Sequence, residues 1–178
     1  MNDLQAVVYQ DGIDFFHELE SKYIRHSKGL FILTPSGAGK TYYCTKQNEQ
    51  HWIDGDDLYF DTGAQPIGYE WWNKGPHIIN RVEQRCDVIT AEAVDRGYWI
   101  MGSINYWLKP DAIVLPTLDT LMRQIKQRQN TNYDGGLKSE QIEQLIVHLG
   151  IINDWYVKYN VPKFTSIQEA VSSLTVNS

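Results

Sequence analysis

The chain has 178 residues, 42% of them hydrophobic and 21% charged, which is typical of one soluble globular domain. Its formal net charge of −6 argues against a protein that coats nucleic acid with a broad basic surface, but is compatible with a local basic groove. No apolar run approaches the roughly 20 residues of a membrane span, and the N-terminus lacks a signal-peptide pattern. A cytoplasmic location without a membrane partner is therefore expected. The two cysteines, Cys44 and Cys86, have no metal-ligand spacing and are expected to be reduced thiols.

Apolar runs and helical periodicities alternate along the chain, which predicts an α/β fold with a parallel sheet of about five strands flanked by helices. The predicted strands are 30–33, 51–53, 98–101, 112–115 and 163–165. The predicted helices are 12–26, one from about Lys40, 78–96, 118–128, 138–160 and 167–174. Residues 55–77 mix glycine, proline and aromatics, and are expected to be loops with one short helix. There is no internal repeat or linker, so residues 1–178 are expected to form a single domain.

A glycine-rich segment at residues 33–41, Leu-Thr-Pro-Ser-Gly-Ala-Gly-Lys-Thr, follows the first predicted strand and opens a helix. A Walker A phosphate-binding loop requires this strand–loop–helix context. Backbone N–H groups of such a loop surround the β-phosphate, and the helix N-terminus adds positive potential. The expected nucleotide-binding residues are Ser36, Gly37, Ala38, Gly39, Lys40 and Thr41. Lys40 would bridge the β- and γ-phosphates, and the Thr41 hydroxyl would ligate magnesium. Thr34 stands where the usual first glycine is expected and changes the start of the loop.

Acidic residues follow the second predicted strand, in Asp54-Gly55-Asp56-Asp57. In a doubly wound sheet, ligands bind at the carboxyl ends of the strands, so this turn is expected beside the glycine-rich segment. Asp54 could hold magnesium, and Asp54 or Asp56 could accept a proton from an attacking hydroxyl. The alternative is a polar turn with solvated carboxylates. No acid follows the third or fourth strand, which argues against a GTPase, a motor ATPase or a simple NTPase.

The order of these pieces resembles the nucleoside monophosphate kinase-like group of P-loop kinases, which includes adenylate, shikimate, gluconate and adenylylsulfate kinases. The resemblance spans the layout of residues 28–175, but only the glycine-rich segment is specific by itself. It implies a three-layer P-loop NTPase fold, ATP and Mg²⁺ as ligands, an acceptor-binding insert at about 58–85 and a lid at about 126–138. Arg128 matches the lid arginine that stabilises charge on the transferring phosphoryl group, and Arg123 could join it. Both arginines could instead be solvated cations near a helix C-terminus.

The acceptor is left open by the sequence. In the predicted insert, Trp71 and Trp72 could stack on a base, or could pack the insert onto the core. Arg81 and Arg85 lie four residues apart and could hold an anionic group.

A hydroxyl on a small metabolite, nucleoside or modified base is the preferred acceptor. A nucleotide phosphate usually requires several arginines, and the whole chain has six. A nucleic-acid acceptor, as in virus-encoded kinases of this superfamily, and a non-catalytic nucleotide-binding module are the remaining alternatives. The preference between ATP and GTP and the oligomeric state are not predicted.

Overall fold

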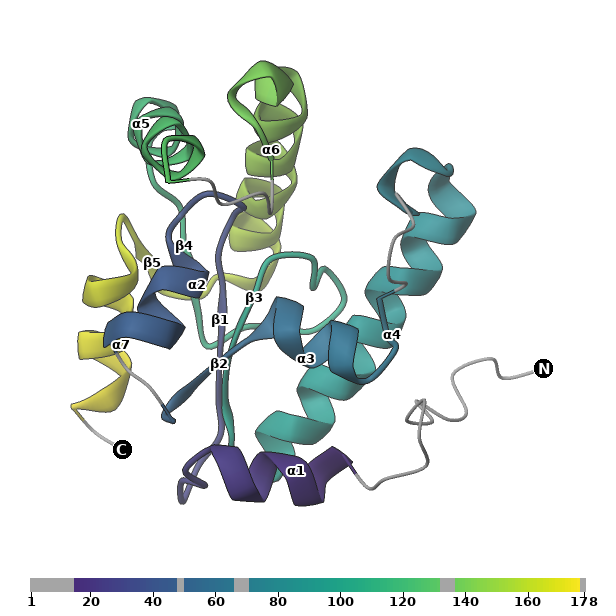
Figure 1. The fold of residues 1–178 in the computed structure, drawn as a ribbon, viewed down its shortest axis with the longest axis vertical. Helices are drawn as coiled ribbons and strands as arrows, with labels where there is room; N and C mark the ends of the chain where they lie inside the picture. The colour runs from purple at the N-terminus through teal and green to yellow at the C-terminus, as the bar shows by residue number, and fades with distance from the viewer. Residues whose placement is uncertain (1–14, 48–49, 66–70, 132–136, 177–178) are drawn as a thin grey trace.

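The computed structural model describes residues 15–47, 50–65, 71–131 and 137–176 (Figure 1). Five strands form one parallel sheet in the order β2-β3-β1-β4-β5. Their bounds are β1 Leu30–Leu33, β2 Trp52–Asp54, β3 Trp99–Gly102, β4 Ala112–Val114 and β5 Lys163–Phe164. Each bound lies within one residue of the predicted strand. The structure thus confirms an α/β fold with a five-stranded parallel sheet flanked by helices.

Seven α-helices are present in the described part of the chain. They are α1 Phe15–Lys22, α2 Lys40–Tyr42, α3 Gly55–Asp61, α4 Pro76–Asp95, α5 Leu118–Gln129, α6 Ile142–Tyr159 and α7 Ile167–Thr175. Shorter turns are η1 Tyr43–Gln47, which is π-helical, and two 3₁₀ turns, η2 Trp71–Asn73 and η3 Ser139–Gln141. None of the helices among the described residues combines the length and apolarity that crossing a bilayer demands.

The central strand β1 is buried on both faces, which is why its sequence is a continuous apolar run. Phe31 and Leu33 pack into a core with residues of α3, α4 and α6, whereas Leu30 and Ile32 face a second core formed with η1 and α7. This alternation follows the two-residue period of a strand. Figure 1 shows the same arrangement, with α7 and α2 on one side of the sheet and α3 and α4 on the other.

The helices differ from the predictions at several points. The helix expected over 12–26 is α1 and ends at Lys22, and residues 12–14 lie outside the described part. The one short helix expected within residues 55–77 is α3, which has seven residues and follows β2 directly. In α6, Ile142 and Ile146 lie at helical spacing with Leu145 and Ile152 but are 37% and 50% exposed. The core covers only the face of α6 that carries Leu145 and Ile152. Apolar residues extend beyond this face, so some of them are exposed.

Candidate functional site

The glycine loop, residues 34–39, leaves the carboxyl end of β1 and enters α2. Its glycines at 37 and 39 have φ values of 88° and 91°, in the left-handed region that favours glycine. Left-handed residues between right-handed ones turn successive N–H groups toward one side, and such concave segments bind anions. The backbone conformation therefore explains both glycines and matches a loop that holds phosphate.

Thr34 occupies a position that does not require glycine. Its N–H donates to the Gly102 carbonyl at 2.9 Å, so Thr34 continues the pairing of β1 with β3, and its φ is not positive. The residue is fully buried. Because both left-handed glycines come later in the loop, a residue with a Cβ is compatible with position 34.

The outer side of the glycine loop packs against α5 and α6. A Cβ on Gly37 would lie 2.8 Å from Cγ1 of Ile125, and Ala38 belongs to a small core with Leu121, Ile125 and Leu145. The Ser36 hydroxyl accepts a hydrogen bond from the Leu137 N–H at 3.4 Å. The outer side of the loop is thus packed against α5 and α6 and hydrogen-bonded to Leu137.

The structure brings Lys40, Asp54 and Asp56 into direct contact. Lys40 Nζ donates to Asp54 Oδ1 and, at 2.8 Å, to Asp56 Oδ2, across separations of 14 and 16 residues. Asp54 is the last residue of β2 and caps α3 by accepting from the Asp56 N–H at 2.9 Å. The side chains of Lys40 and Asp54 are only 7% and 2% exposed, whereas that of Asp56 is 44% exposed. Asp54 is therefore a buried, paired carboxylate, whereas Asp56 is paired with Lys40 and remains partly exposed.

Electrostatics keep Lys40 charged in this site. Burial lowers the pKa of the Lys40 ammonium, but Asp56 and Asp54 outweigh this effect, so its pKa lies above the ordinary value. Burial of an uncompensated ammonium would have the opposite result. The site thus presents a fixed cation flanked by two carboxylates at the carboxyl edge of the sheet.

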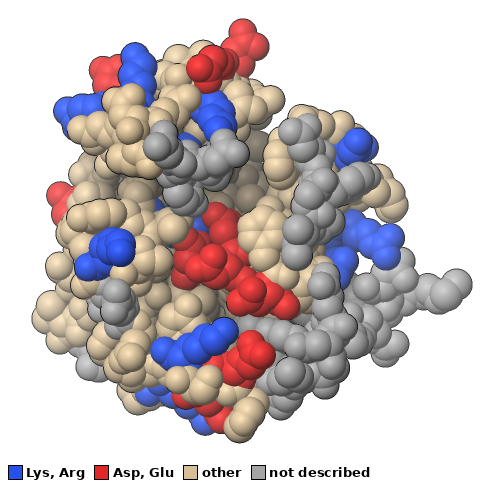
Figure 2. Space-filling model, in the orientation of Figure 1, with Lys and Arg blue, Asp and Glu red and all other residues tan. Residues whose placement is uncertain are grey.

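Further acidic side chains lie on α3 and α4. Figure 2 shows acidic side chains gathered in the middle of the face that lies over α3, which carries Asp56 and Asp57 in its first turn and Asp61 at its end. Two buried acids that the sequence did not single out, Glu83 and Asp87, lie one turn apart on α4. Burial and then the neighbouring Asp87 raise the pKa of Glu83 to about 8, and burial raises that of Asp87 to about 6. Their place among the apolar, inward positions of α4 was a usable signal in the sequence.

The predicted lid residues take different positions. The Arg128 guanidinium donates to the Leu137 carbonyl, so this side chain lies beside the segment that contacts Ser36. Arg123 is exposed and is not on the face of α5 that carries Leu121 and Ile125. Residues 132–136 of the predicted lid lie outside the described part.

The residues predicted to bind the acceptor differ in burial and in their partners. Trp71 is 4% exposed and packs in the main core, whereas Trp72 is 45% exposed and meets the Trp71 ring edge-on at 5.6 Å. Arg85 donates to the Gly63 carbonyl at 2.6 Å and so ties α4 to the segment after α3. Arg81 is exposed on α4. Residues 66–70 of the predicted insert lie outside the described part.

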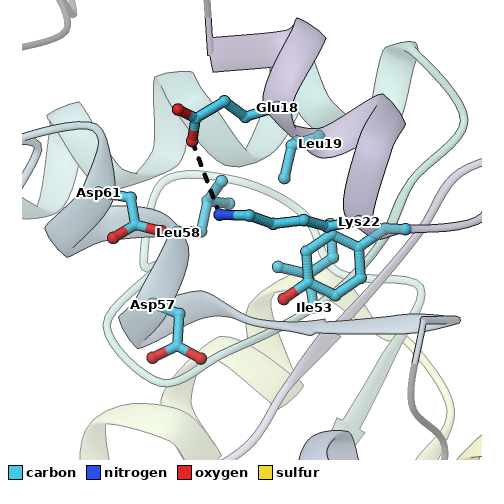
Figure 3. Close-up of a pocket in the computed structure, with 8 residues that line it drawn as sticks. Glu18, Leu19, Lys22, Ile53, Asp57, Leu58 and Asp61 are labelled. Atoms are coloured by element: carbon cyan, nitrogen blue, oxygen red, sulfur yellow. Dashed lines mark ion pairs between the residues drawn. The ribbon is translucent and has the colours of Figure 1, made fainter. Parts of the chain in front are cut away.

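A small hollow between α1 and α3 is shown in Figure 3. It is lined by Glu18, Leu19, Lys22, Tyr23, Ile53, Asp57, Leu58 and Asp61. An ion pair of 3.6 Å joins Lys22 to Glu18 at its rim. The volume is about 30 Å³, which holds about one water molecule. The hollow is too small for a metabolite, so it is not a candidate substrate site.

No protein-family model matches this chain, and no curated protein matches it with a significant score. Among the described residues, no group of three or more His, Cys, Asp or Glu side chains is arranged to hold a metal ion. Mg²⁺ in nucleotide sites takes one or two protein ligands and completes its shell with phosphates and water. The hydroxyl of Thr41 and the carboxylate of Asp54 are the donor types that such an ion prefers.

Proposed function

We propose that this protein is a P-loop phosphotransferase that moves the γ-phosphoryl group of ATP to a hydroxyl acceptor. In this proposal the sheet and the glycine loop form a three-layer P-loop NTPase fold. The single observation that carries it is the buried contact of Lys40 with Asp54 and Asp56 at the end of a glycine loop with two left-handed glycines. One cation and two carboxylates beside an anion-binding loop are the groups that phosphoryl transfer needs.

Each residue of the site has a role in this reaction. The backbone of residues 36–39 would bind the phosphates, and Lys40 would exchange its carboxylate partners for β- and γ-phosphate oxygens. Mg²⁺, held by Thr41 and Asp54 together with the phosphates, would neutralise charge that develops on them. Arg128 would stabilise the same charge from the lid side.

Asp56 is the better placed general base. Its side chain is 44% exposed, whereas that of Asp54 is 2% exposed and caps α3. The acceptor oxygen would form a bond to the γ-phosphorus while the bond from that phosphorus to the β–γ bridging oxygen breaks. Asp56 would take the hydroxyl proton, and ADP would leave.

The charges around the site favour a neutral hydroxyl acceptor over a nucleotide phosphate. The carboxylates of α3, at Asp56, Asp57 and Asp61, would repel a second anionic substrate. Arg85, which could have bound such an anion, donates to a backbone carbonyl instead. Trp72 of the predicted acceptor insert is 45% exposed, which favours an acceptor with a flat ring, such as a nucleoside or a modified base within a nucleic acid.

Transfer of label from γ-labelled ATP with Mg²⁺ tests this proposal. The acceptor pools are nucleosides, nucleotides, small polyols and acids, and DNA that carries hydroxymethylated bases. Labelled product in one pool, lost in Lys40→Ala and Asp54→Asn, is the expected result. Release of free phosphate alone would favour a simple NTPase, and tight ATP binding without turnover would favour a non-catalytic binding module.

A further inference from the structure

A buried hydrogen-bonded ring lies next to the turn that carries Asp54 and Asp56. Its members are Tyr59 of α3, Thr90 of α4 and Asn105 after β3, all fully buried. The Tyr59 hydroxyl donates to Asn105 Oδ1 at 2.7 Å, and Asn105 Nδ2 donates to Thr90 Oγ1 at 3.0 Å. The Thr90 and Tyr59 oxygens lie 2.9 Å apart and complete the ring of contacts, and the Thr90 hydroxyl donates to the Cys86 carbonyl at 2.7 Å. Three elements that meet at the site are thereby joined.

Two glycines show how closely this ring approaches the site. A Cβ on Gly55, which lies between the two site aspartates, would be 2.9 Å from the Tyr59 hydroxyl and 2.7 Å from the Met101 carbonyl. A Cβ on Gly102, at the end of β3, would be 2.0 Å from Asn105 Oδ1 and 2.8 Å from the Tyr59 hydroxyl. The hydroxyl therefore packs directly against the start of α3 and the end of β3.

We propose that Tyr59 is a positioning residue, whose hydrogen-bonded ring fixes the first turn of α3 and with it the Asp56 carboxylate. This inference rests on the proposed phosphotransferase function. In the free protein Asp56 is held by Lys40. Once Lys40 turns to the phosphates, the position of Asp56 depends on the backbone of α3, and Tyr59 lies one turn later on the same side of that helix.

The hydroxyl group, and not only the ring, is required for this role. A phenylalanine at position 59 would fill the same space but would leave Asn105 Oδ1 without its donor in a site that water does not reach. Burial holds the pKa of Tyr59 well above its ordinary value, so the hydroxyl remains a donor at all physiological pH values. The neighbouring loop has a second anchor on α4, since Asp87 accepts from the Trp107 N–H at 2.8 Å.

The test compares Tyr59→Phe with Tyr98→Phe in label transfer from γ-labelled Mg-ATP to the pool that gives most product with the wild type. Tyr98 is 1% exposed, and its hydroxyl has no hydrogen-bond partner among the described residues, so Tyr98→Phe is a matched control. We expect Tyr59→Phe to lower kcat by about 10- to 100-fold with the KM for ATP nearly unchanged. Thr90→Ser, which keeps the hydroxyl, should retain the activity that Thr90→Val loses.

The outcomes separate this inference from the function on which it rests. Wild-type kcat in Tyr59→Phe, or an equal loss in Tyr98→Phe, would overturn the positioning role and leave the phosphotransferase intact. A rise in KM for ATP that matches the loss of kcat/KM would also overturn it, because ATP binding would then be the affected step. A wild type that labels no pool would refute both the proposed function and the positioning role.

Discussion

Replacement of Lys40 by methionine should destabilise the folded protein strongly. The Lys40 side chain is 7% exposed and contacts Asp54, whose side chain is 2% exposed. Methionine keeps most of the volume of the lysine stem, so the change removes mainly the charge. Loss of one partner of a buried ion pair costs about 3–5 kcal/mol, because the other charge stays buried. Since Asp54 still accepts the Asp56 N–H and Asp56 is partly exposed, we expect a loss of about 3 kcal/mol.

Urea unfolding followed by tryptophan fluorescence measures this loss. Lys46→Met, at an exposed lysine of the next turn, is the matched control and should change stability little. The double variant Lys40→Met/Asp54→Asn should recover most of the loss. A loss below about 1 kcal/mol would refute the reasoning, because an exposed ion pair contributes no more than that.

Two further substitutions test the packing and the electrostatics of the site. Gly55→Ala would place a Cβ 2.7 Å from the Met101 carbonyl, so we expect a loss of about 2 kcal/mol or more in urea unfolding and of activity. Gly150→Ala, where a Cβ meets nothing within 4 Å, should instead stabilise α6 by about 0.5–1 kcal/mol. Because burial and Asp87 raise the pKa of Glu83 to about 8, the folded protein retains a proton that the unfolded chain has released, so wild-type stability should fall as pH rises from about 4.5 to about 8. Glu83→Gln should remove the part of this fall above about pH 6, where Asp87 no longer contributes, and should be about 2 kcal/mol more stable than the wild type at pH 9, and an unchanged pH profile would contradict the assignment.

The strands could be predicted from the sequence because each is a short apolar run bounded by turn residues. Helix α3 was predicted only as part of a loop region with one short helix. Its seven residues, Gly55–Asp61, begin with glycine and two aspartates, which read as a turn. The helix is stabilised by a cap from Asp54 and by the burial of Leu58 and Tyr59, which depends on tertiary packing.

Some residues of the site could likewise be predicted from the sequence, and others could not. Lys40, Asp54 and Asp56 were predictable because each follows a strand, and the carboxyl ends of parallel strands share one edge of the sheet. The hydrogen-bonded ring around Tyr59 could not be predicted, since its hydrogen bonds join residues 31 and 46 positions apart and no local pattern marks them. The burial of Trp71 beside an exposed Trp72 likewise depends on how η2 packs against α4.

Calorimetric binding of Mg-ATP to the wild type and to Lys40→Met tests most directly whether the glycine loop and Lys40 hold a triphosphate. Binding is measured at a temperature at which both proteins are folded, with Lys46→Met as the control. The proposed function predicts that the wild type and Lys46→Met bind alike and that Lys40→Met binds at least about 30-fold more weakly, as loss of a charged hydrogen bond to phosphate implies. Equal binding by Lys40→Met, or no binding by the folded wild type, would contradict the proposed function.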